Sequence, residues 1–304
     1  MSYLYFPGCS LKSTGRGYEE SILPVFEALQ MPVKELNDWN CCGATAYMSI
    51  NELTAFALSA RNLALAEKQN PDSRSETVNL MAPCAGCYLV LNKTERYLKE
   101  FPDIRKKISD SLKSANLEYK GKVKVRHPLD ILVNDFGTDK LSKQVKNPLR
   151  GLKIACYYGC QIVRPYAEFD DQHNPITMDR LMQAIGATTV DWPLKTRCCG
   201  GSLTGTIQDV GLRLSYIILR EAKKRGADLV ATACPLCQFN LECFQNKMGR
   251  LYHDEVNMPV FYFSQLIGLA LGIPAKKLAM ERSFVPLKTS DMAKIMEGGT
   301  NVRS

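Results

Sequence analysis

Short apolar runs alternate with longer amphipathic segments along this chain. Two of the runs, at 2–6 (SYLYF) and 152–156 (LKIAC), are rich in aromatic and aliphatic residues and end shortly before a Gly-Cys pair, which is typical of a buried strand followed by a turn. Two more, at 77–83 (TVNLMAP) and 228–233 (DLVATA), run into a Cys-x-x-Cys motif. The pattern therefore predicts four buried strands, each followed by a cysteine-bearing turn.

Amphipathic segments with helical periodicity follow the turns. Ser49 and Glu52 have the spacing of a helix-capping box, and apolar side chains then recur at helical intervals over 53–64. Thr206 and Asp209 precede a similar segment. Alternation of strand, cysteine turn and helix favours a mostly parallel sheet with covering helices. We predict an α/β fold of two pseudo-symmetric, Rossmann-like repeats, with the cysteines at the carboxyl ends of strands, where open α/β sheets bind ligands.

The cysteines repeat one pattern twice. Each copy has an aromatic-x-Gly-Cys segment, a Cys-Cys-Gly triplet and a Cys-x-x-Cys motif. The first copy contains Cys9, Cys41, Cys42, Cys84 and Cys87, and the second contains Cys160, Cys198, Cys199, Cys234 and Cys237. Cys156 and Cys243 have no counterpart in the repeat, and we expect both to be buried thiols.

A polar segment around 137–151 separates the two copies. We therefore expect a first repeat over 1–145, a second repeat over 146–274 and a polar C-terminal tail over 275–304.

Composition restricts the compartment and the class of protein. The chain has 304 residues, of which 45% are hydrophobic, and this content is ample for a buried core. The chain contains twelve cysteines. Its first residues show neither the basic segment nor the long apolar core of a secretory signal. We expect a cytoplasmic protein, and in that reducing compartment clustered thiols indicate metal or redox sites before disulfides.

Hydropathy and charge argue against a membrane span and against nucleic-acid binding. The longest apolar stretch, 261–273, is interrupted by Ser264 and Gln265 and is too short to cross a bilayer of about 30 Å. The net charge is +8, but Lys and Arg are interspersed with acidic residues, which is typical of solvated helix faces. The basic excess could still steer an anionic substrate or an acidic partner.

Five thiols per copy fit zinc and disulfides poorly. Structural zinc takes four ligands in a closed tetrahedron, usually from two knuckles, so each copy has one cysteine too many and only one knuckle. A disulfide between neighbours such as Cys41 and Cys42 closes a strained ring that cytosolic thiols reduce. A zinc-stabilised scaffold without redox activity is the weaker alternative.

Iron–sulfur clusters suit the pattern better, because their several irons are held by thiolates and adjacent cysteines can bind neighbouring irons. Gly43 and Gly200 directly follow the cysteine pairs. We expect them to contact the cofactor, with an unusual φ and no Cβ where the backbone passes the inorganic core. The fifth cysteine of each set points to more than a plain electron relay, since an ordinary cubane cluster needs four.

Six segments carry a resemblance to a known family: PGCS, DWNCCGAT, APCAGC, YYGC, RCCGG and ACPLCQFNL. They resemble the cysteine-rich CCG domains of the heterodisulfide reductase B-subunit family, and the resemblance covers about residues 3–272. It implies that each five-cysteine set holds one non-cubane [4Fe-4S] cluster. All ten of the corresponding positions are cysteines here.

The resemblance also implies a reaction and partners. It implies an oxidoreductase that acts on sulfur groups: the catalytic B-type subunit of a complex that reductively cleaves a disulfide, such as the mixed disulfide of coenzyme M and coenzyme B or a related one. Electrons would come from a ferredoxin-like iron–sulfur protein, the C-type subunit, because the chain has no C-x-x-C-x-x-C-x-x-x-C-P run of its own. A flavin-containing A-type subunit would complete the complex.

Substrate contacts are less strongly indicated. Arg164, Lys195 and Arg197 lie near cysteines of the second copy and could bind carboxylate, phosphate or sulfonate groups, or form structural pairs. His127 follows a β-like run and could hydrogen-bond near a cluster or sit in the core. An alternative function is an electron-transfer CCG subunit of a dehydrogenase or of a succinate- or lactate-oxidising complex. The identity of the disulfide does not follow from the sequence.

Overall fold

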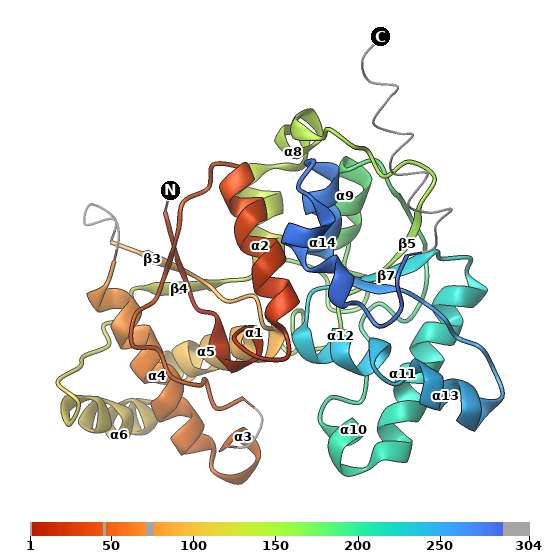
Figure 1. Ribbon diagram of the computed structural model, residues 1–304. Helices are drawn as coiled ribbons and strands as arrows, with labels where there is room; N and C mark the ends of the chain where they lie inside the picture. The colour runs from red at the N-terminus through yellow and green to blue at the C-terminus, as the bar shows by residue number, and fades with distance from the viewer. Residues whose placement is uncertain (1, 45–46, 71–75, 288–304) are drawn as a thin grey trace. The chain divides into compact units, whose positions relative to one another are not determined.

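The computed structural model describes residues 2–44, 47–70 and 76–287 (Figure 1). Within them lie two four-stranded sheets in which every strand pair is parallel. The first has the order β2-β1-β3-β4, with β1 (Tyr3–Tyr5), β2 (Val33–Glu35), β3 (Val78–Met81) and β4 (Val123–Arg126). The second has the order β6-β5-β7-β8, with β5 (Lys153–Tyr157), β6 (Thr188–Thr189), β7 (Leu229–Thr232) and β8 (Val260–Tyr262). The predicted α/β fold with two repeats is confirmed.

The four strands predicted from the sequence are the central pairs of these sheets. β1 and β7 are buried at every position, as parallel strands covered on both faces are. Tyr5 of β1 pairs with Met81 of β3, and Tyr157 of β5 pairs with Thr232 of β7. Because neighbouring parallel strands end at one edge of a sheet, the turns that follow them begin close together. This brings the first cysteine of each set near the Cys-x-x-Cys motif.

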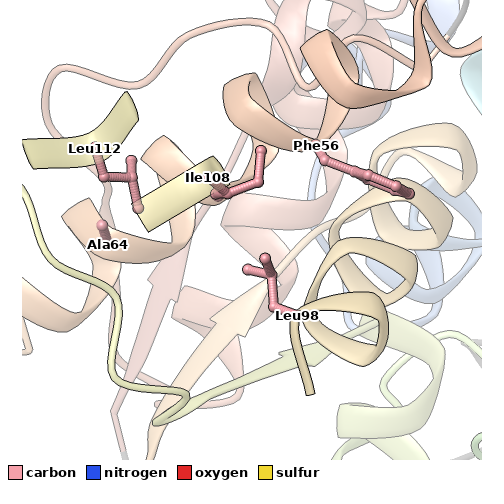
Figure 2. Close-up of a cluster of buried hydrophobic side chains, with 6 residues drawn as sticks. Phe56, Ala64, Leu98, Ile108 and Leu112 are labelled. Carbon is pink, nitrogen blue, oxygen red and sulfur yellow. The ribbon is translucent and has the colours of Figure 1, made fainter. Parts of the chain in front are cut away.

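One compact unit comprises the residues up to Ser13 and Gln30–Pro128. Its helices are α1 (Gly8–Leu11), α3 (Tyr47–Ile50), α4 (Glu52–Lys68), α5 (Ala85–Glu100) and α6 (Pro102–Lys113). A cluster of buried apolar side chains joins three of them: Phe56, Ala60 and Ala64 of α4, Leu98 of α5, and Ile108 and Leu112 of α6 (Figure 2). Helix α6 thus closes over α4 in this unit.

The second compact unit comprises Thr14–Leu29 and the chain from Leu129 onward. Its longer helices are α2 (Arg16–Ala28), α9 (Thr177–Ala184), α11 (Gln208–Lys224), α12 (Pro235–Glu242), α13 (Gln245–Tyr252) and α14 (Phe263–Ala270). Its shorter ones are the π-helix η1 (Ile131–Phe136), α8 (Thr138–Gln144), α10 (Leu203–Thr206) and the 3₁₀ helices η2 (Ala275–Leu278) and η3 (Met280–Arg282), while α7 (Pro128–Asp130) lies at the junction of the units.

Helix α2 belongs to this second unit although its sequence lies within the first repeat. Tyr18 of α2 stacks on Tyr262, with ring centroids 4.6 Å apart, and the hydroxyls of Ser21 and Ser264 lie 2.6 Å apart. Residues 275–282 of the predicted polar tail form η2 and η3, with Leu278 fully buried. From 288 on, the predicted tail lies outside the described residues.

The helices after the cysteine pairs are confirmed, but their predicted caps are wrong. Asn51 caps α4 by accepting a hydrogen bond from the Thr54 backbone N–H at 3.1 Å, whereas Ser49 lies within α3. Helix α11 begins at Gln208 without a side-chain cap, and Thr206 ends α10. In the described part of the chain, no helix has the length and hydropathy needed to cross a membrane.

Candidate metal centres

The first cysteine set converges within the first unit from three separate turns. Cys9 lies in α1 after β1, Cys84 is the N-terminal cap residue of α5 after β3, and Cys41 and Cys42 lie between β2 and α3. The Sγ atoms of Cys42 and Cys87 are 3.2 Å apart. Cys41 is hydrogen-bonded to Cys42, and Cys84 to Cys87, while Cys9 is close enough to affect the ionisation of Cys41. All five predicted thiols of this set are neighbours.

The second set has the same construction within the second unit. The Sγ atoms of Cys199 and Cys237 are 3.6 Å apart. Cys160 is hydrogen-bonded to Cys198, and Cys234 to Cys237. Cys234 is the N-terminal cap residue of α12, as Cys84 is of α5. Two separate regions of the chain therefore build the same five-thiol arrangement.

Hydrogen bonds between these thiols divide them into easily ionised and poorly ionised partners. Bonds from Cys41 and Cys87 lower the pKa of Cys42 to about 4, and a bond from Cys160 lowers the pKa of Cys198 to about 6. The hydrogen bond between Cys199 and Cys237 lowers the pKa of Cys199 to about 7 and raises the pKa of Cys237. The thiolate is the form that binds metal, so each set contains at least one cysteine ready to ligate.

Gly8 and Gly159, which precede the first cysteine of each set, have positive φ angles of +64° and +70°. A Cβ at Gly8 would lie 2.7 Å from the Sγ of Cys87, and one at Gly159 would lie 2.9 Å from the Sγ of Cys237. No side chain fits there, so these glycines leave space for the sulfur atoms. They were missed from the sequence, although the Gly-Cys pair is visible in both copies.

Gly43 and Gly200 also have positive φ angles, +80° and +101°, as predicted. Their missing side chains also serve helix packing, and the expected contact with a cofactor stays a prediction. A Cβ at Gly43 would lie 3.2 Å from the Cα of Ala55 in α4, and one at Gly200 would lie 2.9 Å from the Cα of Gly211 in α11. The backbone after each cysteine pair therefore passes close to the following helix.

Two serines hold the cysteine pairs against those helices. The hydroxyl of Ser59 in α4 donates to the carbonyl of Cys42, and that of Ser215 in α11 donates to the carbonyl of Cys199, both at 2.9 Å. These residues were not identified from the sequence because an isolated serine in a helix gives no signal of its contact.

In the described part of the chain, a side-chain amide contacts a cysteine sulfur at the second set. The side-chain amide of Asn240 in α12 lies 3.3 Å from the Sγ of Cys199, and it also donates to the carbonyl of Gly201 at 2.8 Å. The corresponding position in the first copy, three residues after the motif's second cysteine, is Val90, which has no polar side-chain atom. Both sets have a backbone N–H donor on a sulfur at 3.4 Å, from Gly43 to Cys41 and from Gly200 to Cys198, and the second set has this side-chain donor in addition.

The cationic residues predicted near the second set have different surroundings. Arg164 donates to the carbonyl of Thr196, and its charge helps to lower the pKa of Cys198. Arg197 is exposed. Lys195 is buried and forms an ion pair with Asp179 at 3.0 Å, so its charge is already matched within the protein.

His127 is fully buried in the first unit. One ring nitrogen lies 3.1 Å from the carbonyl oxygen of Pro83, the residue before Cys84, and the ring meets Tyr88 edge-on at 5.6 Å. The histidine thus supports the turn that carries Cys84 from within the core.

Of the two cysteines outside the repeat, Cys156 is fully buried, as predicted. The prediction is wrong for Cys243, which is partly exposed because it follows the last residue of α12.

The donor set fits an iron–sulfur cluster. Five thiols on three turns can distribute over several irons, and the space kept by Gly8 and Gly159 lies at the sulfur of a Cys-x-x-Cys motif in both units. Among the described residues, no three His, Cys, Asp or Glu side chains are arranged to hold a single metal ion.

The fold and the two thiol sites define a protein built from two cysteine-rich α/β repeats. Residues 3–92 and 154–242 match the family model of the CCG cysteine-rich domain. The chain therefore belongs to the CCG cysteine-rich domain family, as its resemblance to the B subunit of heterodisulfide reductase predicts.

Relatives of known name align along nearly the whole chain. The 8-methylmenaquinol:fumarate reductase membrane anchor subunit of Wolinella succinogenes is 31% identical, over 93% of this chain and 96% of its own length. The B subunit of the ferredoxin:CoB-CoM heterodisulfide reductase of Methanosarcina mazei is 30% identical, over 96% of each chain. A protein of Archaeoglobus profundus that is named as like the heterodisulfide reductase B subunit is 28% identical over 286 residues.

A solved structure shares the fold. A hypothetical protein from Helicobacter pylori superposes with a TM-score of 0.75 at 17% identity, and the match covers 94% of this chain. The chain spans about half of that protein, because the same match covers 52% of its length.

Proposed function

We propose that this chain is the catalytic B-type subunit of a heterodisulfide reductase-like complex, which reductively cleaves a disulfide such as the mixed disulfide of coenzyme M and coenzyme B or a related one. The observation that carries the proposal is the pair of complete five-thiol sets, built alike in both units. It is supported by 30% identity to the Methanosarcina mazei B subunit over 96% of each chain.

In this proposal each five-thiol set holds one non-cubane [4Fe-4S] cluster. Such clusters, when bound, would supply single electrons and an iron open to a substrate sulfur. The overall reaction consumes two electrons and two protons, breaks one S–S bond and releases two thiols. The chain's own residues position the ligands: Gly8 and Gly159 leave room for sulfur, and Ser59 and Ser215 hold the cysteine pairs.

Arg197 and Arg164 are the proposed contacts for an anionic group of the substrate. Arg197 is exposed beside Cys198, and the charge of Arg164 reaches the Cys198 thiol. Lys195, which pairs with Asp179, has a positioning role at the second set in this proposal. The buried His127 has a positioning role at the first set.

Partner subunits follow from the same proposal. A flavin-containing subunit would pass electrons to a ferredoxin-like iron–sulfur subunit, which would deliver them to this chain. The names of the relatives support this, because they describe subunits of larger reductases.

A second candidate function is electron transfer within another respiratory complex. The observation that favours it is the 31% identity to a subunit of the Wolinella succinogenes fumarate reductase. In that case the same thiol sets would pass electrons to a different acceptor, without binding a disulfide.

An anaerobic titration tests these functions. The iron-loaded chain is expected to contain about eight irons with sulfide, and added thiol or disulfide is expected to change its EPR signals. Zinc without iron would refute the cluster proposal and favour a scaffold. A chain that contains iron, gives no response to any disulfide and supports a coupled dehydrogenase would favour the second candidate.

A further inference from the structure

Helix α4 of the first unit and helix α11 of the second occupy equivalent places after their cysteine pairs, so their surroundings can be compared residue by residue. Ser59 of α4 and Ser215 of α11 donate the same hydrogen bond to the second cysteine of their pairs. Aligned on these serines, Ala60 and Ala64 of α4 correspond to Tyr216 and Arg220 of α11.

In the first unit the two aligned positions are apolar and covered, while Arg61, at the position of Ile217, pairs with Asp38. Ala60 and Ala64 are buried, and Ile108 and Leu112 of α6 pack in the same cluster (Figure 2). Nothing from outside this unit is needed to cover the two alanines.

In the second unit the corresponding helix borders an open groove of about 540 Å³. Helix α11 lines it with Arg213, Tyr216, Ile217 and two further cations, and residues 193–194 complete it. Ile217 belongs to the periodic apolar series of this helix, yet 41% of its surface is exposed. Helix α13, which follows α12 in the chain, contributes an aromatic contact, with the ring centroids of Tyr252 and Tyr216 4.2 Å apart. In the second unit Tyr216 is thus buried against Tyr252 of α13, whereas Ile217 and Arg220 stay exposed beside the groove.

The groove is strongly basic. Arg213, Arg220 and Lys224 are exposed cations along it, and the acidic lining residue Glu221 is paired with Arg225 at 2.8 Å. Neither Arg213 nor Lys224 forms a salt bridge within the described part of the chain, whereas Arg220 lies 3.9 Å from the carboxylate of Asp254. The guanidinium of Arg213 instead lies over aromatic rings, 5.2 Å from the centroid of Tyr252.

Its place in the fold connects the groove to the second thiol set. Residues 193–194 lead directly into the loop with Cys198 and Cys199, and α11 carries the serine bonded to Cys199. A molecule in the groove would therefore lie against elements that position these cysteines.

From this comparison we infer that the α11 groove is a docking site for a protein partner, which binds through a segment of acidic side chains interspersed with aliphatic or aromatic ones. Arg213 and Lys224 attract the acidic groups, with the exposed Arg220 between them along the helix, while Ile217, Pro193 and Leu194 offer apolar contact. A peptide with aliphatic side chains matches the apolar residues Pro193, Leu194 and Ile217 beside these cations, whereas the phosphates and sugars of a nucleic acid backbone would leave them without an apolar partner. The inference adds a surface to the proposed function and does not depend on which disulfide is cleaved.

Binding of a probe peptide to the full iron-loaded chain tests the inference. The probe is a fluorescein-labelled peptide of alternating glutamate and leucine, followed by anisotropy at low and physiological salt. We expect saturable binding that weakens as salt screens the charges. The triple variant Arg213→Gln, Arg220→Gln and Lys224→Gln should weaken it at least about tenfold, or about 1.4 kcal/mol.

The matched control removes the same charge elsewhere. Arg105→Gln, Lys106→Gln and Lys107→Gln alter three exposed cations of α6 and should change the affinity less than about twofold. Equal losses in the two triple variants would overturn the inference, as would absence of saturable binding. Tighter binding of an oligothymidine that depends on the same three groove cations would overturn it in favour of nucleic acid. Iron content and disulfide reduction with a small-molecule electron donor test the proposed function separately, since neither requires the peptide.

Discussion

With one cluster in each thiol set, as proposed, the amide of Asn240 is expected to set the two clusters apart in reduction potential. Reduction adds negative charge to a cluster and its thiolates, so an N–H donor near a ligand sulfur stabilises the reduced form more than the oxidised one. Asn240 supplies such a donor to Cys199, and Val90 at the equivalent position of the first set does not. Asn240→Leu should therefore make the potential of the second cluster more negative.

The geometry limits the size of this shift. One amide hydrogen is committed to the Gly201 carbonyl at 2.8 Å, and the other is shared between the sulfur of Cys199 at 3.3 Å and its carbonyl at 3.5 Å. A hydrogen bond to a charged group contributes about 1.5–3 kcal/mol, and we assign roughly a third of this to the change on reduction through a shared bond. About 0.5–1 kcal/mol corresponds to about 20–40 mV for a one-electron couple.

An EPR-monitored redox titration measures this shift, with the first cluster as an internal reference. Thr204→Val is the matched control, because the Thr204 hydroxyl donates to the Asn240 carbonyl oxygen at 2.8 Å and does not touch the sulfur. The control should leave both potentials within about 10 mV, since it keeps the N–H···S contact. Equal shifts of both clusters in Asn240→Leu, no shift at all, or a shift of the same size in Thr204→Val would refute the reasoning.

Three further predictions follow from the packing around the sites. Gly8→Ala should lose the iron of the first site and keep the iron of the second, because a Cβ would lie 2.7 Å from a ligand sulfur. The control Gly121→Ala, at a position with a similar positive φ and open space around it, should keep the iron of both sites in an iron assay. Lys195→Met should lower the free energy of unfolding by about 3–5 kcal/mol, since it leaves Asp179 buried and unpaired, and adding Asp179→Leu should restore part of it in denaturant titrations. If the double variant is no more stable than the single one, the ion pair is not the cause. Burial raises the pKa of Cys243 to about 11. The rate of alkylation of Cys243 in the folded protein should therefore rise about tenfold per pH unit up to pH 10, whereas the rate in the unfolded chain should level off above about pH 9. A plateau below about pH 10 in the folded protein would contradict this prediction.

Local patterns were enough to predict the fold class and the membership of the two thiol sets. Strand–turn–helix alternation and the repeated cysteine spacing depend on residues close together in the chain, and the structure places them in two parallel sheets of the same order. The proximity of the cysteines followed from one rule of parallel sheets, that neighbouring strands end at the same edge.

Contacts between distant residues decided the rest. No local pattern indicates that a Cβ at Gly8 would collide with the sulfur of Cys87, or that Asn240 would reach Cys199. Helix caps were misplaced for a related reason, because the short helix α3 comes between the cysteine pair and α4 and moves the cap to Asn51.

The same division holds for the surfaces. The sequence by itself determined that α4 and α11 are amphipathic helices after matching cysteine pairs and that the chain carries a basic excess. Only the tertiary structure decided that α6 covers the alanines of α4 and that a basic groove lies beside α11, because coverage depends on which distant segment packs there. The sequence thus specifies the ligands, and the packing of distant segments specifies their surroundings.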